Sequence, residues 1–382
     1  MWTRILGVKY VNNLQKRMVP ACILASILLL VLVVGSTHTP YRDKYDGEQI
    51  FILKVSVTYV NRDEQAIWNL SEEDRAVSLF MNNSWQTVYL IETSHSIEKF
   101  TYDLDGNKIA ILNLTKTSIF PGEKITYNVT YRMVFKQRVL PAISEENSGN
   151  LSAIPENLKK IYCQSNSLWQ PNSSIFKRKA LEIAGNETKV LSIVKRFVKW
   201  INRHIRYRSS EIPRYPNETL QQLAGDCDDQ ANLLITFCRA IGIPAYLQVG
   251  CIYMPGDYQN LTYWNGRLTI SERNLGWHGW AVVYVPPWGW LPVDLTYVSG
   301  NLAIKPLNSI TRSAVVRHYT FQYMNITETD YVAESKAFKS FLESYKFYVY
   351  ESEEMYKVTE REEGISIINV RKIIIFNAKI RR

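Results

Sequence analysis

Apolar and polar residues alternate along three segments, 51–57, 87–91 and 125–131. Because successive side chains of a strand point to opposite faces of a sheet, this period of two predicts strands with one buried face. Several such strands separated by turns are typical of a β-sandwich. We therefore expect residues 48–137 to form a β-sandwich domain.

The period changes to that of a helix over 190–201, where apolar residues recur at spacings of three and four. A second helix is predicted from Asp226, and it ends at Gly242 with Pro244 close behind, a typical stop signal. Strands are expected at 246–253, 280–285 and 291–295. The fold class is therefore α+β, with the core over residues 150–300.

Residues 301–382 carry no recognisable chemical motif. An amphipathic pattern predicts a helix over 331–348, and the apolar run 365–376 predicts a strand. We expect this region to be an α/β extension that packs on the core.

Residues 19–35 are apolar apart from Ser26 and would span roughly 25 Å as a helix, close to the thickness of a bilayer core. Residues 1–18 carry basic side chains and no acidic ones, which places the N-terminus in the cytoplasm. We expect a single transmembrane anchor, a stalk over 36–47 and an extracytoplasmic body. A signal peptide cleaved near Gly35 is the alternative, and it too exports the body.

Asn-x-Ser/Thr sequons support export, since composition alone would give roughly three and the chain has more. They begin at Asn69, Asn82, Asn113, Asn128, Asn150, Asn172, Asn186, Asn217, Asn260 and Asn325.

The net charge of +9 comes from the two ends of the chain, because residues 1–18 and 371–382 hold nine basic residues and no acids. The body between them is neutral. Binding to nucleic acid needs a basic folded surface, so we expect no nucleic-acid partner.

Five cysteines are an odd and low number for an exported protein. Cys227 and Cys238 lie about 16 Å apart along one predicted helix, too far for a disulfide. A bridge among Cys163, Cys238 and Cys251 stays open, and Cys227 can keep its thiol.

Cys227 opens an apolar helix directly after Gly225-Asp226, which makes it a candidate nucleophile. The helix dipole favours a thiolate there, but the neighbouring aspartates oppose it by a similar amount. A charged imidazole in contact with the sulfur is therefore required, and His278 is the candidate.

His278 and Asp294 are expected on two antiparallel strands joined at Pro286-Pro287-Trp288-Gly289. A turn centred on Pro287 places Asp294 opposite Trp280, and therefore diagonal to His278 on the same face of the sheet. The carboxylate would orient the imidazole and stabilise its charged form. Cys227, His278 and Asp294 are thus predicted to form a catalytic triad.

We expect no cofactor and no metal. Asp226, Asp228 and Asp229 are interpreted as a solvated helix start, and Asp103-Leu104-Asp105-Gly106-Asn107 as a hairpin turn. The remaining histidines, His95, His204 and His318, are interpreted as surface residues.

The segment 190–297 resembles the transglutaminase-like superfamily of cysteine enzymes, specifically its membrane-anchored, prokaryotic-type members. The resemblance rests on the motifs Gly225-Asp226-Cys227-Asp228-Asp229-Gln230-Ala231, Gly242-Ile243-Pro244-Ala245, His278-Gly279-Trp280 and Gly289-Trp290-Leu291-Pro292-Val293-Asp294. It implies a papain-like core in which Cys227 is the nucleophile, His278 the general base and acid, and Asp294 the orienting residue. Tyr246 and Leu295 stand where the family often has arginine and proline.

The resemblance also implies a thioester acyl-enzyme and chemistry on amides of proteins or peptides. A cysteine peptidase or amidase is the leading expectation. Protein crosslinking at glutamine side chains and a non-catalytic envelope-binding role are the alternatives. The substrate and the oligomeric state stay open.

Overall fold

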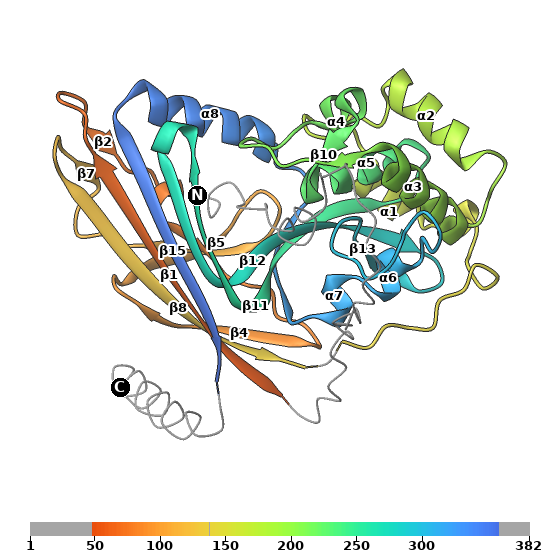
Figure 1. Cartoon of the computed structure of the whole chain (residues 1–382), viewed down its shortest axis with the longest axis horizontal. Helices are drawn as coiled ribbons and strands as arrows, with labels where there is room; N and C mark the ends of the chain where they lie inside the picture. The colour runs from red at the N-terminus through yellow and green to blue at the C-terminus, as the bar shows by residue number, and fades with distance from the viewer. Residues whose placement is uncertain (1–47, 137, 359–382) are drawn as a thin grey trace, which may run out of the picture.

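One large mixed sheet runs through the computed structural model, which describes residues 48–136 and 138–358 (Figure 1). Its strands are β1 (Gln49–Asn61), β4 (Gln86–Thr93), β8 (Lys124–Phe135), β11 (Ala245–Tyr263), β12 (Leu268–Val285), β13 (Gly289–Val293), β14 (Thr320–Ile326) and β15 (Phe347–Lys357). They lie in the order β14-β11-β12-β15-β1-β8-β4, and β13 pairs with the second half of β12. The predicted strands at 51–57, 87–91 and 125–131 are confirmed as parts of β1, β4 and β8.

The sandwich expected for residues 48–137 is not closed on itself. The strand β15 pairs with β1 on one side and with β12 on the other, so the N-terminal strands continue the sheet of the core. A three-stranded sheet of β3 (Ala76–Ser78), β6 (Lys108–Leu112) and β5 (Ile97–Tyr102) faces this region, where the Tyr131 hydroxyl donates to the Ser78 carbonyl at 2.9 Å. A further small sheet pairs β2 (Trp68–Asn69) with β7 (Ser118–Ile119), and η1 (Glu73–Arg75) precedes β3.

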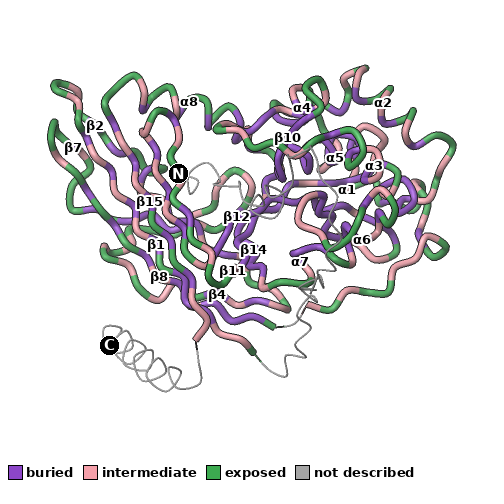
Figure 2. The backbone as a smooth tube through the Cα atoms, viewed as in Figure 1, coloured by how far each residue is buried: buried purple, intermediate pink, exposed green. Residues whose placement is uncertain are grey.

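Helices gather at the other end of the molecule (Figure 1). They are α1 (Glu156–Tyr162), α2 (Ser174–Ala184), α3 (Val190–His204), α4 (Pro216–Gln222) and α5 (Cys227–Ala240), preceded by η2 (Leu151–Ala153). The predicted helix 190–201 is confirmed in α3, whose apolar face is buried. In α5 every residue from Cys227 to Arg239 is buried (Figure 2), because this helix contacts α2, α3 and α4 on one side and β11 and β12 on the other.

The remaining short elements are β9 (Arg206–Tyr207), β10 (Ala224–Gly225), α6 (Asn308–Thr311), α7 (Ala314–Arg317) and η3 (Trp264–Gly266), which connects β11 to β12. The predicted helix at 331–348 is confirmed as α8 (Tyr331–Ser344) and ends earlier than expected, since β15 begins at Phe347. The expected strand 365–376 and the expected anchor 19–35 lie outside the described residues. Within 48–358, none of the helices is both long and apolar enough to cross a membrane.

Candidate active site

Cys227 is the first residue of α5, and Asp226 is the residue that caps this helix. A reciprocal capping box holds the helix start, in which the Asp226 amide donates to Asp229 Oδ2 at 3.2 Å and the Asp226 side chain accepts from the Asp229 amide. A Cβ at Gly225 would lie 2.6 Å from the Asp229 Cβ. Glycine at 225 therefore lets the chain approach the helix closely and turn the cysteine into it.

His278 lies on β12, and Asp294 follows β13 directly. The observed register pairs Ala281 with Val293, as predicted for a turn centred on Pro287. His278 Nε2 is 2.9 Å from Asp294 Oδ2. The ring N–H is not aligned with Oδ2, so the two side chains are in close contact without a linear hydrogen bond.

The Asp294 carboxylate is held in place by its other oxygen. Oδ1 accepts hydrogen bonds from the backbone amides of Thr296 at 3.0 Å and Tyr297 at 3.1 Å. The Asp294 amide in turn donates to the Ser309 carbonyl at 2.9 Å. These bonds fix the carboxylate and leave Oδ2 directed at the imidazole.

The Cys227 thiol contacts β12 next to His278. The backbone N–H of Gly279, the residue that follows His278, donates to the Cys227 sulfur. His278 Nδ1, on the side of the ring away from Asp294, makes no hydrogen bond with the described residues. The structure thus pairs His278 with Asp294 and places the Cys227 sulfur against Gly279, the residue that follows His278.

Burial keeps the resting thiol protonated. It raises the pKa of Cys227 well above its usual value, and the carboxylates of Asp228 and Asp226 raise it further. The amides of Gly279 and Asp228 act in the opposite direction. The effects that raise the pKa of the thiol thus exceed those that lower it.

All three side chains are covered in this conformation. Cys227 is 1% exposed, and His278 and Asp294 are fully buried. The cavity found under the sheet is lined by Val55, Tyr131, Glu353 and their neighbours, and by none of the three. The thiol is therefore closed to solvent in this conformation.

The aspartates beside Cys227 correct one prediction. Asp226, Asp228 and Asp229 were expected at a solvated helix start, but they are 0%, 2% and 0% exposed. Their oxygens lie within 4.8 Å of one another, the spacing of a possible metal site. Asp229 is instead paired with Arg214 at 2.6 Å, and Asp228 accepts from the Tyr331 hydroxyl at 2.8 Å. Such buried carboxylates need these partners, and a cation would have to displace them.

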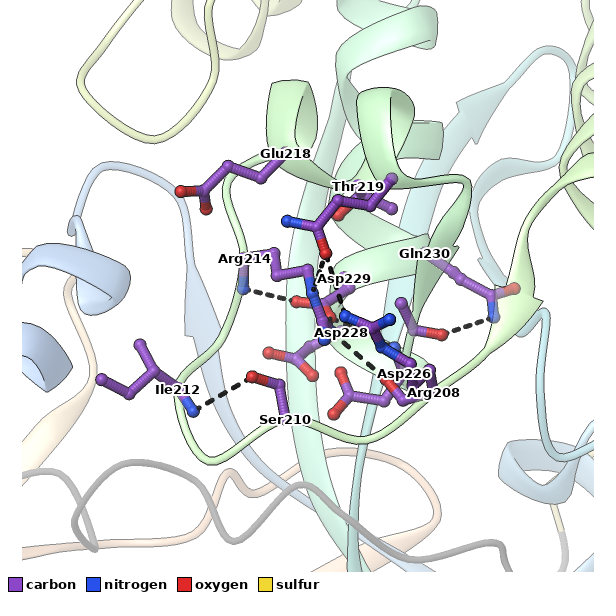
Figure 3. Close-up of polar contacts among 12 residues, drawn as sticks. Arg208, Ser210, Ile212, Arg214, Glu218, Thr219, Asp226, Asp228, Asp229 and Gln230 are labelled. Atoms are coloured by element: carbon purple, nitrogen blue, oxygen red, sulfur yellow. Dashed lines mark hydrogen bonds and ion pairs between the residues drawn. The ribbon is translucent and has the colours of Figure 1, made fainter. Parts of the chain in front are cut away.

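Figure 3 shows this arrangement, with Arg214 beside Asp229 and Gln230 turned away to the Gly225 carbonyl. Arg214 comes from the loop before α4 and Tyr331 from the start of α8. Sequence reasoning missed both residues. No local pattern marks them, because each acts on α5 from a distant part of the chain.

Tyr331 belongs to a buried chain of hydrogen bonds. Asn232 Nδ2 donates to the Tyr331 hydroxyl at 2.6 Å, and Trp169 Nε1 donates to Asn232 Oδ1 at 3.1 Å. The region 301–382, to which no role was assigned from sequence, therefore supports the helix that carries Cys227. Among the described cysteines, Cys163, Cys227, Cys238 and Cys251, no disulfide forms.

Residues 177–295 match the family model of the transglutaminase-like superfamily. No curated protein matches the sequence. Among solved structures, the chain is similar to a candidate cysteine protease from Cytophaga hutchinsonii, with 16% identity over 82% of this chain and 90% of that one and a TM-score of 0.48. It is also similar to the periplasmic domain of TgpA from Pseudomonas aeruginosa, with 16% identity over 67% and 90% and a TM-score of 0.30. Residues 177–295 of this chain form a transglutaminase-like domain.

Proposed function

We propose that this chain is an extracytoplasmic thiol enzyme that cleaves amide bonds of proteins or peptides, with Cys227, His278 and Asp294 as its catalytic triad. The observation that carries the proposal is the contact of 2.9 Å between His278 Nε2 and Asp294 Oδ2, next to a cysteine held at a helix start. A buried histidine paired with a carboxylate near a nucleophile is the arrangement that thiol acyl transfer requires.

The geometry supports the following steps. His278 Nδ1 takes the proton of the Cys227 thiol as the sulfur attacks the amide carbonyl carbon. The backbone N–H of Cys227 donates to the oxygen on which negative charge develops. When the carbon–nitrogen bond breaks, the imidazolium returns the proton to the leaving amine, and a thioester remains. Water activated by His278 then attacks the thioester and releases the acid.

Asp294 has an electrostatic role in these steps. Its carboxylate faces the imidazole from the side opposite Nδ1 and stabilises the charged ring that forms on proton transfer. The hydrogen bonds from Thr296 and Tyr297 keep it from turning away.

An extracytoplasmic location is part of the proposal and rests on sequence features. The apolar segment 19–35 would anchor the chain. Of the sequon asparagines, all are exposed except Asn325, whose amide oxygen accepts from Gln248 at 2.7 Å. Exposed sequons are accessible to a glycosylating enzyme, whereas Asn325 is committed to the fold.

A labelled amine separates hydrolysis from crosslinking. We expect the full chain to release free amine from an unlabelled casein digest without incorporating dansylcadaverine into casein, because water is the acyl acceptor in a peptidase. Cys227→Ala should lose all release. Cys163→Ala should keep it, since Cys163 is a half-buried thiol near Cys238, at the opposite end of α5 from Cys227. Incorporation of the dye would instead assign the crosslinking function. Equal activity of the wild type and Cys227→Ala would reject both.

A further inference from the structure

Tyr207 lies beside the segment that leads into Cys227. The short parallel pair of β9 and β10 places Tyr207 opposite Gly225, two residues before the cysteine. The pairing is fixed by two backbone hydrogen bonds, from Arg206 to the Leu223 carbonyl at 2.9 Å and from Arg208 to the Gly225 carbonyl at 3.1 Å. The tyrosine is therefore held against the start of α5.

The hydroxyl of Tyr207 is buried; its polar neighbour is the Ser209 side chain, and the two do not form a hydrogen bond of normal geometry. A buried donor without an acceptor is unfavourable by about 1–3 kcal/mol, and native structures rarely keep one without a use. Tyr331, the other tyrosine near α5, has its hydroxyl fully engaged by Asp228 and Asn232. Tyr331 thus has the contacts of a structural residue, whereas the Tyr207 hydroxyl is able to bind a further group.

The surroundings of Tyr207 keep its hydroxyl protonated, so that it can donate a hydrogen bond. Burial raises the pKa of Tyr207 well above its usual value, and the nearby Cys227, Asp226 and Asp228 raise it further. Only Ser209 acts in the opposite direction. The Tyr207 hydroxyl therefore lies near enough to Cys227, Asp226 and Asp228 for their charges to act on it.

We propose that Tyr207 is a catalytic residue whose hydroxyl, together with the Cys227 backbone N–H, forms the oxyanion hole. This inference rests on the proposed thiol acyl transfer and supplies the second donor that such a site needs. The hydroxyl gains an acceptor only when the carbonyl oxygen of the substrate becomes negative. An interaction made only at that stage lowers the barrier without tightening substrate binding.

Trp280 is the alternative candidate for the second donor of the oxyanion hole. Its indole Nε1 is also buried without a partner among the described residues, and its ring centroid is 5.8 Å from that of His278. Trp280, however, packs against Val282 and Val315. It also lies against Gly250, where an added Cβ would come within 2.8 Å of the indole. The position of Trp280 is set by packing, whereas Tyr207 pairs directly with Gly225 in the segment that leads into Cys227.

Two reagents that react with the same thiol test the proposal in the full chain. Acylation of Cys227 by p-nitrophenyl acetate forms a carbon–sulfur bond through an oxyanion and expels p-nitrophenolate, and the thiol proton passes to His278. Alkylation by iodoacetamide displaces iodide at a saturated carbon and forms no oxyanion. Only the first reaction uses an oxyanion hole.

In Tyr207→Phe we expect the acylation rate to fall by about 10²-fold, the usual effect of removing one oxyanion donor. The alkylation rate and its pH profile should stay within about twofold of the wild type. Tyr102→Phe, which removes a hydroxyl from an exposed strand residue, should leave both rates unchanged.

Unchanged acylation in Tyr207→Phe would overturn this inference, as would an equal fall in both rates or a selective loss in Trp280→Phe instead. Wild-type acylation no faster than that of Cys227→Ala would reject the proposed enzyme itself, and the inference with it.

Discussion

Replacing Arg214 by methionine is expected to lower the free energy of unfolding by about 3–5 kcal/mol at pH 8, the usual effect of removing one partner of a buried ion pair. The Arg214 side chain is 8% exposed and that of Asp229 is 0% exposed, with 2.6 Å between Nη1 and Oδ2. Without the guanidinium, Asp229 would be left as a buried charge at the start of α5.

The loss should be smaller at low pH. Burial and the neighbouring Asp228 already raise the pKa of Asp229 to about 6, against the lowering effect of Arg214. In Arg214→Met this pKa rises further, so at pH 5 the carboxyl is protonated and less unfavourable. Urea unfolding at pH 5 and pH 8 measures the difference.

Arg206→Met is the matched control, because Arg206 is exposed on the neighbouring strand β9. We expect it to change the stability by less than about 0.5 kcal/mol. Equal stability of the two variants at pH 8 would show that the Arg214–Asp229 pair does not hold the helix start.

Replacing Glu353 by glutamine is expected to stabilise the protein at alkaline pH. Glu353 on β15, Glu272 on β12 and Glu351 on β15 are 3%, 0% and 5% exposed, and they point to the same face of the sheet. Trp277 Nε1 donates to Glu353 Oε2 at 2.5 Å. Burial and then Glu351 raise the pKa of Glu353 to about 8, and burial and Glu353 raise that of Glu272.

The sign of the pH dependence follows from these directions. A carboxyl whose pKa is higher in the folded state than in the unfolded chain keeps a proton that the unfolded chain releases. The free energy of unfolding therefore falls as the pH rises from about 4.5, the usual glutamate value, to about 8. Glutamine is neutral throughout, so Glu353→Gln should flatten this fall and gain on the order of a few kcal/mol at pH 8.

Thermal or urea unfolding of both proteins at pH 5 and pH 8 measures the effect, and little difference is expected at pH 5. Glu354→Gln is the control, since Glu354 is the next residue and its side chain is 48% exposed beside Arg273. A wild-type stability that rises between pH 5 and pH 8 relative to Glu353→Gln would contradict the burial of a protonated acid.

Strands and helices with a clear period could be predicted from the sequence, and their pairing across the sheet could not. The alternation at 51–57 and the helical spacing at 190–201 are local signals. The first segment lies in β1 and the second in α3. The joining of β1 to β12 through β15 depends on residues separated by about 300 positions in one pairing and about 80 in the other, for which no local pattern exists. For the same reason, a self-contained sandwich was expected where the sheet is continuous.

The same distinction between local and long-range signals applies to the candidate site. The hairpin geometry of His278 and Asp294 followed from counting residues around Pro287, because an antiparallel register is fixed by its turn. The burial of Asp226, Asp228 and Asp229 did not follow, since charged residues at a helix start are usually solvated. Their partners Arg214 and Tyr331 lie in other elements, so only the fold could show why these acids are inside.

The start of α5 is held by partners from other elements of the fold. Asp229 is held by Arg214 from before α4, Asp228 is held by Tyr331 from α8, and Cys227 comes directly before both in the chain and lies against β12. Burial and the carboxylates of Asp228 and Asp226 raise the pKa of the thiol.

The rate of Cys227 alkylation against pH, in the wild type and in His278→Ala, tests the central claim most directly. Iodoacetamide on the full chain with peptide mass spectrometry distinguishes Cys227 from the other cysteines, and any opening of the covered site affects both proteins alike. We expect the wild type to react at least about tenfold faster near pH 7, because the imidazole accepts the thiol proton, and His278→Ala to react only toward alkaline pH. Superimposable profiles would show that the histidine does not act on the sulfur, and would contradict the triad.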